Sequence, residues 1–300
     1  MDEKSLTDNR QRVDRVLGTC LLAYSTTNFL KFPLTEALER IAAGGFRNVE
    51  IWGNLKHLDP RSETEDVKEV AETCRRLELR VVSIHAPFTL QGVSSPPDER
   101  MRTWEALVSE SMEQAGFLGA RLLVVHPVTA GADESLADYR EIVKRTGDSL
   151  VKLADMAGKK EMRLAVENMP GHRSRRFGRE VGDLYSAVTE GGRENLGLCL
   201  DTGHVIFNNG DPVRDLELYH DRIFSIHMND NIWGMHMDLH LVPGAGSVDW
   251  ERFRTLLVSL PFEGMIVLEL DGRGRPSSVF DEAGRFVKRF FEQDEQVGRD

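Results

Sequence analysis

Short apolar segments recur eight times along this chain, and longer segments with helical spacing separate them. The short segments cover residues 19–24, 47–52, 80–85, 121–126, 163–167, 197–201, 223–227 and 265–269. Each is rich in Val, Ile and Leu, as expected for strands that are buried on both faces of a parallel sheet. Because parallel neighbours need a crossover connection, the alternation predicts repeated β/α units.

The intervening segments have apolar residues at helical spacing, most clearly in residues 34–43, 63–78, 98–118, 134–157, 249–259 and 276–291. No linker rich in Pro, Gly or Ser separates the units. We therefore predict an α/β fold, a single-domain (β/α)8 TIM barrel over residues 17–292. Residues 1–16 and 293–300 are expected to be polar extensions.

Composition excludes several other classes of protein. The chain is 40% apolar and 29% charged, and no segment approaches the roughly 18 apolar residues of a membrane span. The charged N-terminus lacks an export signal, so we expect a cytoplasmic location. Cys20, Cys74 and Cys199 are widely spaced and are expected to be reduced packing residues. A net charge of −11 disfavours nucleic acid as a partner.

Six consecutive predicted strands end on a residue that can bind a metal or move a proton. These residues are His85, His126, Glu167, Asp201, His227 and Glu269. The carboxyl ends of barrel strands surround one shallow bowl, where barrel enzymes carry out their chemistry. We therefore expect the six side chains to converge, although they are far apart in the sequence.

Three further candidates lie just beyond strand ends: His204 in the loop after the sixth strand, and Asp238 and His240 after the seventh. Burying so many carboxylates and imidazoles together is costly without a compensating cation. The donor set favours Mn²⁺ or Zn²⁺, with Mg²⁺, Fe²⁺ or Co²⁺ as alternatives. The remaining histidines are expected to be non-ligands: His57, His172, His220 and His236.

The chain resembles the xylose isomerase-like TIM-barrel superfamily, which includes sugar phosphate isomerases and epimerases together with endonuclease IV. The matching stretches are HAPF (85–88), VVHP (124–127), AVENMP (165–170), CLDTGH (199–204), IHMNDN (226–231), DLHLVPGAGSVDW (238–250) and VLEL (267–270). The resemblance covers about residues 17–290.

In isomerases and epimerases of this kind, the resemblance implies one divalent metal held by Glu167, Asp201, His227 and Glu269. The metal would stabilise an ene-diolate of a small sugar, keto-sugar or sugar phosphate. Glu167 and Glu269 would then exchange the carbon-bound proton, with His204 as a further proton carrier.

Endonuclease IV offers the alternative, a zinc-dependent phosphodiesterase that acts at abasic sites. It uses nine ligands for three zinc ions, and the resemblance implies counterparts at His85, His126, Glu167, Asp201, His204, His227, Asp238, His240 and Glu269. Phe88 replaces a tyrosine of the nuclease pattern, and Leu239 stands where an arginine is expected. A second alternative is a non-catalytic barrel that binds a sugar.

Candidate substrate contacts lie near the predicted mouth of the barrel. They are Glu50, Trp52, Phe88, Trp233 and Arg273. Aromatic faces stack on sugar rings, and an arginine suits a phosphate or carboxylate. We therefore expect a sugar-like small molecule as the substrate. Barrels of this type often pair, so a homodimer is a further expectation.

Overall fold

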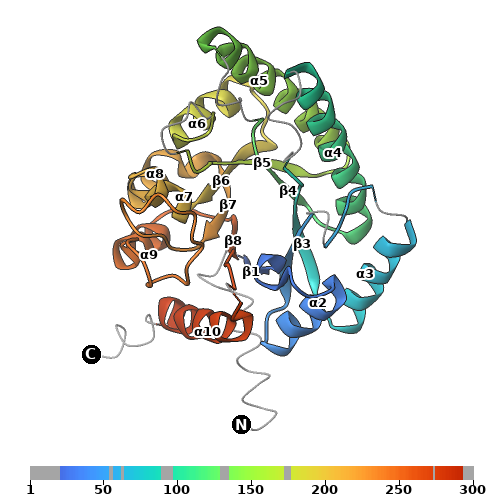
Figure 1. The fold of residues 1–300 in the computed structure, drawn as a ribbon, viewed down its shortest axis with the longest axis vertical. Helices are drawn as coiled ribbons and strands as arrows, with labels where there is room; N and C mark the ends of the chain where they lie inside the picture. Colours follow the sequence, from blue (N-terminus) through green and yellow to red (C-terminus); the bar gives the residue numbers. More distant parts are fainter. Residues whose placement is uncertain are drawn as a thin grey trace.

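The computed structural model describes residues 21–53, 57–61, 64–88, 97–128, 135–171, 177–272 and 274–292, so the expected polar extensions and Cys20 lie outside the described residues. Within them, eight parallel strands close into a barrel in their order along the chain, with helices around it (Figure 1). The predicted single-domain (β/α)8 TIM barrel is confirmed. No helix in the described part of the chain is long and apolar enough to cross a membrane.

The strands are four to six residues long. They are β1 (Leu21–Ser25), β2 (Asn48–Trp52), β3 (Arg80–His85), β4 (Leu122–Val125), β5 (Arg163–Glu167), β6 (Leu196–Asp201), β7 (Ile223–Met228) and β8 (Met265–Leu268).

Each strand is followed along the chain by one or two α-helices. They are α2 (Leu34–Ala43), α3 (Thr64–Arg76), α4 (Pro97–Leu118), α5 (Leu136–Gly158), α6 (Val181–Glu190), α7 (Thr202–Phe207), α8 (Pro212–Tyr219), α9 (Trp250–Ser259) and α10 (Pro276–Glu292). Two 3₁₀ turns, η1 (Thr26–Phe29) and η2 (His220–Arg222), precede α2 and β7.

Alternation along the strands divides the core into two parts. In β4, Leu123 and Val125 belong to the large cluster that packs the strands against the helices, whereas Leu122 and Val124 belong to one of two small separate clusters. Successive strand residues point to opposite faces, so this small cluster lies in the barrel interior. It also contains Ala165, Cys199 and Phe224.

Three predicted ligands lie at slightly different positions from those expected. His126 and Glu269 each follow the last residue of a strand, because hydrogen bonding in the sheet ends at Val125 and Leu268. His204 lies in the short helix α7 and not in a loop. All three still lie at the carboxyl end of the barrel, so the expected convergence is unaffected.

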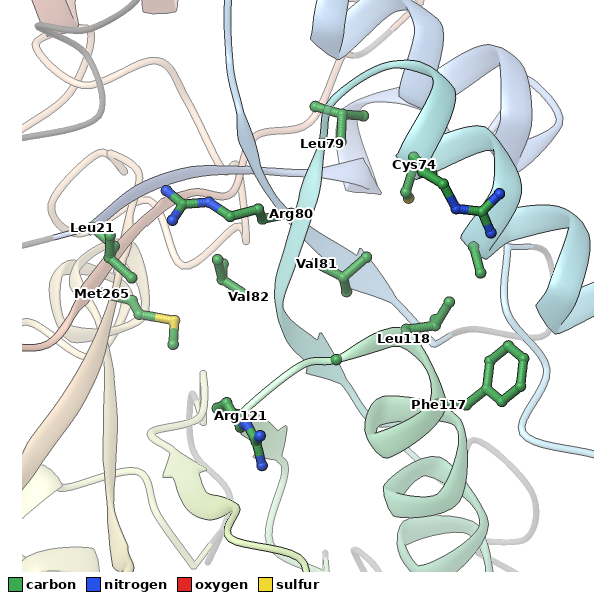
Figure 2. Close-up of a pocket in the computed structure, with 13 residues that line it drawn as sticks. Leu21, Cys74, Leu79, Arg80, Val81, Val82, Phe117, Leu118, Arg121 and Met265 are labelled. Atoms are coloured by element: carbon green, nitrogen blue, oxygen red, sulfur yellow. The ribbon is translucent and has the colours of Figure 1, made fainter.

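A cavity of about 440 Å³ opens at the amino end of the barrel. Its wall includes Leu21, Arg80 and Met265, the first residues of β1, β3 and β8. In Figure 2 the Arg80 and Arg121 side chains extend in different directions, and the described lining residues include no carboxylate or histidine. This cavity therefore lacks the converging polar groups of a catalytic site.

Candidate metal centre

The predicted ligands converge at the carboxyl end of the barrel. His85, Glu167 and Asp201 are the last residues of β3, β5 and β6, and His227 is the next-to-last residue of β7. All four are at most 1% exposed, and Glu269 is 4% exposed. Buried charge at this density requires compensation by opposite charge.

Glu167, Asp201, His227 and Glu269 form the tightest group. Each can offer one ligand atom, and these atoms lie within 4.8 Å of one another. Two donors on opposite sides of an ion at about 2.1 Å are about 4.2 Å apart, so the spacing fits one divalent ion. Glu269 Oε2 is buried and has no hydrogen bond to a described residue, although it forms an ion pair with His227 Nδ1 at 2.8 Å. We call these four residues the central group.

A second group lies beside the first and shares Glu167 with it. His85 Nε2 and His126 Nε2 are each 2.8 Å from Glu167 Oε2. The ligand atoms of these three residues also lie within 4.8 Å of one another. Two imidazoles and a shared carboxylate could therefore hold a second ion.

A third group shares Asp201 with the central group and adds His204 and His240. Asp238 lies between the two histidines, with its carboxylate oxygens 3.4 Å from His204 Nε2 and 3.3 Å from His240 Nε2. His240 has a positive φ of 40°. A non-glycine residue rarely adopts this backbone conformation unless the surrounding structure fixes it, and such residues cluster at functional sites.

The segment from Asp201 to His204 is held in place by hydrogen bonds and by close packing against Asn229. Asp201 Oδ1 accepts a 2.6 Å hydrogen bond from the His204 backbone and thereby caps α7. Asn229 donates to Asp201 Oδ2 at 2.7 Å. A Cβ at Gly203 would lie 1.9 Å from Asn229 Oδ1, so only glycine fits between them. His204 Nδ1 lies 2.8 Å from the Asn168 carbonyl oxygen.

Asp230 holds the loop that carries Asp238 and His240, a role that the sequence reasoning missed. The Asp230 side chain is fully buried and accepts hydrogen bonds from one indole and four backbone N–H groups. The donors are Trp250 Nε1 and the backbone nitrogens of Asn231, Gly244, Ser247 and Val248. The glycine-rich turn that donates to Asp230 begins at Gly244, 14 residues later in the sequence, so no local signal pointed to this role.

Carboxylates keep most of the buried histidines protonated. Burial lowers the pKa of His204, but the charges of Asp201 and Asp238 outweigh it and raise the pKa to about 9. The pKa values of His227 and His240 are raised well above their usual range by neighbouring carboxylates, against the opposing effect of burial. His126 differs, because burial dominates and lowers its pKa to about 4.

The pKa values of the buried carboxylates shift in different directions. Burial raises the pKa of Glu269, but the charge of His227 outweighs burial and lowers it to about 2. The pKa of Glu167 is also lowered, by His227 and His126 against burial. For Asp201, burial dominates and raises the pKa. Without a metal, the positive charge of these histidines balances the buried carboxylates, and a divalent cation could take over that role.

A cavity of about 390 Å³ lies above the central group. Its described lining residues are Trp52, His85, Phe88, His126, Glu167, Met169, Pro170, His204, Asp238, His240 and Glu269. Phe88 stacks on His126 with ring centroids 4.8 Å apart, and Trp52 lies 5.9 Å from Phe88. The cavity thus combines an aromatic wall with several groups that can transfer protons.

Only some of the predicted substrate contacts line this cavity. Trp52 and Phe88 line the cavity, as their positions suggested. The expected position of Glu50 at the mouth is wrong, because Glu50 points into the barrel interior and is 0% exposed. Trp233 is 54% exposed and is absent from the described lining of the cavity. Arg273 lies outside the described residues.

The histidines expected to be non-ligands lie near backbone carbonyl groups. His57 is 3.2 Å from the Phe32 oxygen, and His236 is 3.1 Å from the Phe207 oxygen. His220 is 3.1 Å from the Glu217 oxygen, and His172 lies outside the described residues. None of the three described residues belongs to a metal-binding group within the described chain.

A family model described as a xylose isomerase-like TIM barrel matches residues 38–290. The chain belongs to this family. The match includes every predicted ligand, from His85 to Glu269. The resemblance inferred from the sequence motifs is therefore confirmed.

Curated proteins similar to this xylose isomerase-like barrel carry several different names. An uncharacterized protein of Methanocaldococcus jannaschii is 27% identical over 249 residues, covering 82% of each chain. A probable endonuclease 4 of Thermoplasma acidophilum is 26% identical over 226 residues, covering 70% of this chain and 75% of that protein. An inosose dehydratase of Clostridium botulinum is 26% identical over 264 residues, covering 79% and 81%. Family membership thus indicates an enzyme without fixing its reaction.

Solved structures show the same barrel fold. A D-tagatose 3-epimerase-like protein has a TM-score of 0.75 and 23% identity, covering 90% of this chain and 97% of that one. The IolI protein with a binding zinc atom has a TM-score of 0.71 and 18% identity, covering 90% and 98%. Divalent metal binding therefore occurs within this fold.

Proposed function

We propose that this protein is a divalent-metal-dependent isomerase or epimerase of a small sugar, keto-sugar or sugar phosphate. The proposal depends mainly on one observation. Glu167 and Glu269 belong to the central group and also line the cavity, whereas the described lining includes neither Asp201 nor His227. The two glutamates can therefore face a metal and a substrate at the same time.

The donor set suits the chemistry. Three carboxylates and one imidazole with ligand atoms within 4.8 Å fit Mn²⁺ or Zn²⁺. A divalent ion held there would polarise a substrate carbonyl and make the neighbouring carbon-bound proton more acidic.

The side chains supply the proton transfers. Lowered pKa values keep Glu167 and Glu269 ionised, so either carboxylate can accept a proton from the substrate. We assign proton removal to Glu269 and proton return to Glu167, with His204 as a further proton carrier. Trp52 and Phe88 would stack on the sugar and exclude water from the reacting carbon.

The names of similar proteins support the substrate class. The D-tagatose 3-epimerase-like structure and the inosose dehydratase sequence both have names that refer to small polyhydroxylated molecules. A cavity of about 390 Å³ has room for a substrate of this size.

A direct test is exchange of solvent deuterium into a panel of keto-sugars and sugar phosphates, followed by NMR on the metal-loaded protein. We expect Glu269→Gln to reduce exchange by about 100-fold or more, because the change removes a general base and a metal ligand together. The matched control, Glu72→Gln, changes an exposed glutamate on α3 and should exchange normally. Normal exchange in Glu269→Gln would remove Glu269 from the mechanism.

A second candidate function is hydrolysis of a phosphodiester by two or three metal ions. The observation that favours it is that the second and third groups share Glu167 and Asp201 with the central group. Relatives named probable endonuclease 4 are consistent with it. The net charge of −11 favours a small substrate over DNA. Incision of an abasic-site duplex by the zinc-loaded protein would support this candidate.

A further inference from the structure

The two ring nitrogens of His227 face different carboxylates. Nδ1 lies 2.8 Å from Glu269 Oε2 and 3.3 Å from Glu167 Oε1, both in the central group. On the other side of the ring, Nε2 lies 3.3 Å from Glu50 Oε1 and 3.4 Å from Glu50 Oε2. The ring therefore lies between the central group and a carboxylate outside it.

Glu50 lies deep in the barrel, on β2. Its side chain is fully buried, and Oε2 accepts a 2.7 Å hydrogen bond from the Ser83 hydroxyl. Within the described residues Glu50 neither lines the cavity nor belongs to a metal-binding group. A buried carboxylate is costly unless it has partners, and the partners of Glu50 are Ser83 and His227.

We propose that Glu50 is a positioning residue for the metal centre. It accepts the proton on His227 Nε2 and thereby directs the unprotonated Nδ1 toward Glu167 and Glu269. Histidines that bind metals commonly donate their second N–H to a carboxylate, which fixes both the ring and its tautomer. The inference rests on metal binding by the central group and is independent of the reaction catalysed there.

Other roles for Glu50 fit less well. A substrate contact would require access to the cavity, and Glu50 is 0% exposed. The Cys199 thiol also lies against His227, but a neutral thiol is a weaker hydrogen-bond acceptor than a carboxylate. Cys199 therefore provides a matched control, since Cys199→Ala removes volume beside the same ring without removing the carboxylate.

The first test measures the affinity for Zn²⁺ by competition with a chromophoric chelator, together with the melting temperature of each metal-free variant. We expect Glu50→Ala to weaken binding by about 10- to 100-fold, the range found for such supporting partners. Ser83→Ala should weaken it less, and Cys199→Ala should leave it nearly unchanged. Unchanged affinity in a folded Glu50→Ala or Glu50→Gln protein would overturn the inference.

The second test uses the unchanged chain and does not depend on a variant that folds. Histidine ¹⁵N–¹H correlation spectra of the Zn²⁺-loaded protein report which nitrogen carries the proton, and His227→Gln assigns the signal. We expect a proton on Nε2 of His227, and a proton on Nδ1 would contradict the inference. If the unchanged protein binds no metal, the proposed function fails together with this inference. If it binds metal and the Glu50 variants bind equally well, only the inference fails.

Discussion

Asp201 and His204 are linked by a 2.6 Å hydrogen bond from the His204 backbone to Asp201 Oδ1. The same carboxylate therefore begins helix α7 and belongs to the central group. Asp201, at the end of β6, thus has two separable roles: it caps helix α7, and it contributes a negative charge to the central group.

Asp201→Asn should separate these roles. Asparagine caps helices about as well as aspartate, so this variant keeps the cap and loses only the carboxylate charge that raises the pKa of His204. Metal affinity should fall, because an amide replaces a charged ligand. Asp201→Ala loses the cap as well, and its free energy of unfolding should drop by a further ~1 kcal/mol. Denaturant unfolding and metal titration of both variants measure the two roles. Equal metal affinity in Asp201→Asn and the unchanged protein would exclude Asp201 as a ligand.

Metal binding should release protons at neutral pH. His204 has a pKa of about 9 without metal, and the pKa values of His227 and His240 are raised well above the usual range. Imidazole must lose a proton before it binds a metal, so affinity should weaken as the pH falls. Calorimetric titration in two buffers of different ionisation enthalpy counts the protons released. Binding heats that are independent of the buffer would contradict this account.

The stability of the metal-free protein should depend on the protonation of His204. The folded pKa of about 9 exceeds the ordinary value of 6.5, so protonated His204 stabilises the fold fully below pH 6.5. This contribution should disappear as the pH rises through about 9. We predict a decrease in stability over that interval in the presence of a chelator and a shallower decrease in His204→Gln. Identical pH profiles for the two proteins would show that His204 does not contribute.

Gly203→Ala should be destabilising. Its Cβ would lie 1.9 Å from Asn229 Oδ1 and would displace the amide that donates to Asp201. We expect a loss of about 1–3 kcal/mol, typical of an added methyl group without space. The control is Gly284→Ala on α10, where an added Cβ meets nothing within 4 Å. That change should be neutral or stabilising, by up to about 1 kcal/mol. Equal melting temperatures for the two variants would refute the steric explanation.

Sequence reasoning predicted the barrel and the convergence of its ligands for a physical reason. The apolar runs ending at His85, Glu167 and Asp201 define parallel strands, and a closed barrel brings their carboxyl ends together. The pattern identifies a residue at a strand end without revealing how deep its side chain lies. Glu50 was therefore placed at the mouth, although it lies within the barrel.

Features that depend on long-range contacts could not be predicted in the same way. Helix α7 has only six residues, too few to show a helical repeat, so His204 was expected in a loop. The role of Asp230 depends on donors up to 20 residues later in the chain, which meet only after the loop has closed. Neither feature leaves a periodic signal in the sequence.

Metal stoichiometry tests the central claim most directly. Elemental analysis of protein purified without a chelator should find about one divalent ion per chain, with Mn²⁺ or Zn²⁺ favoured by the donor set. Glu269→Gln should lose most of that metal, whereas Glu72→Gln should retain it. Two or three zinc ions per chain would contradict a single-metal isomerase and favour the phosphodiesterase, and no metal at all would contradict both.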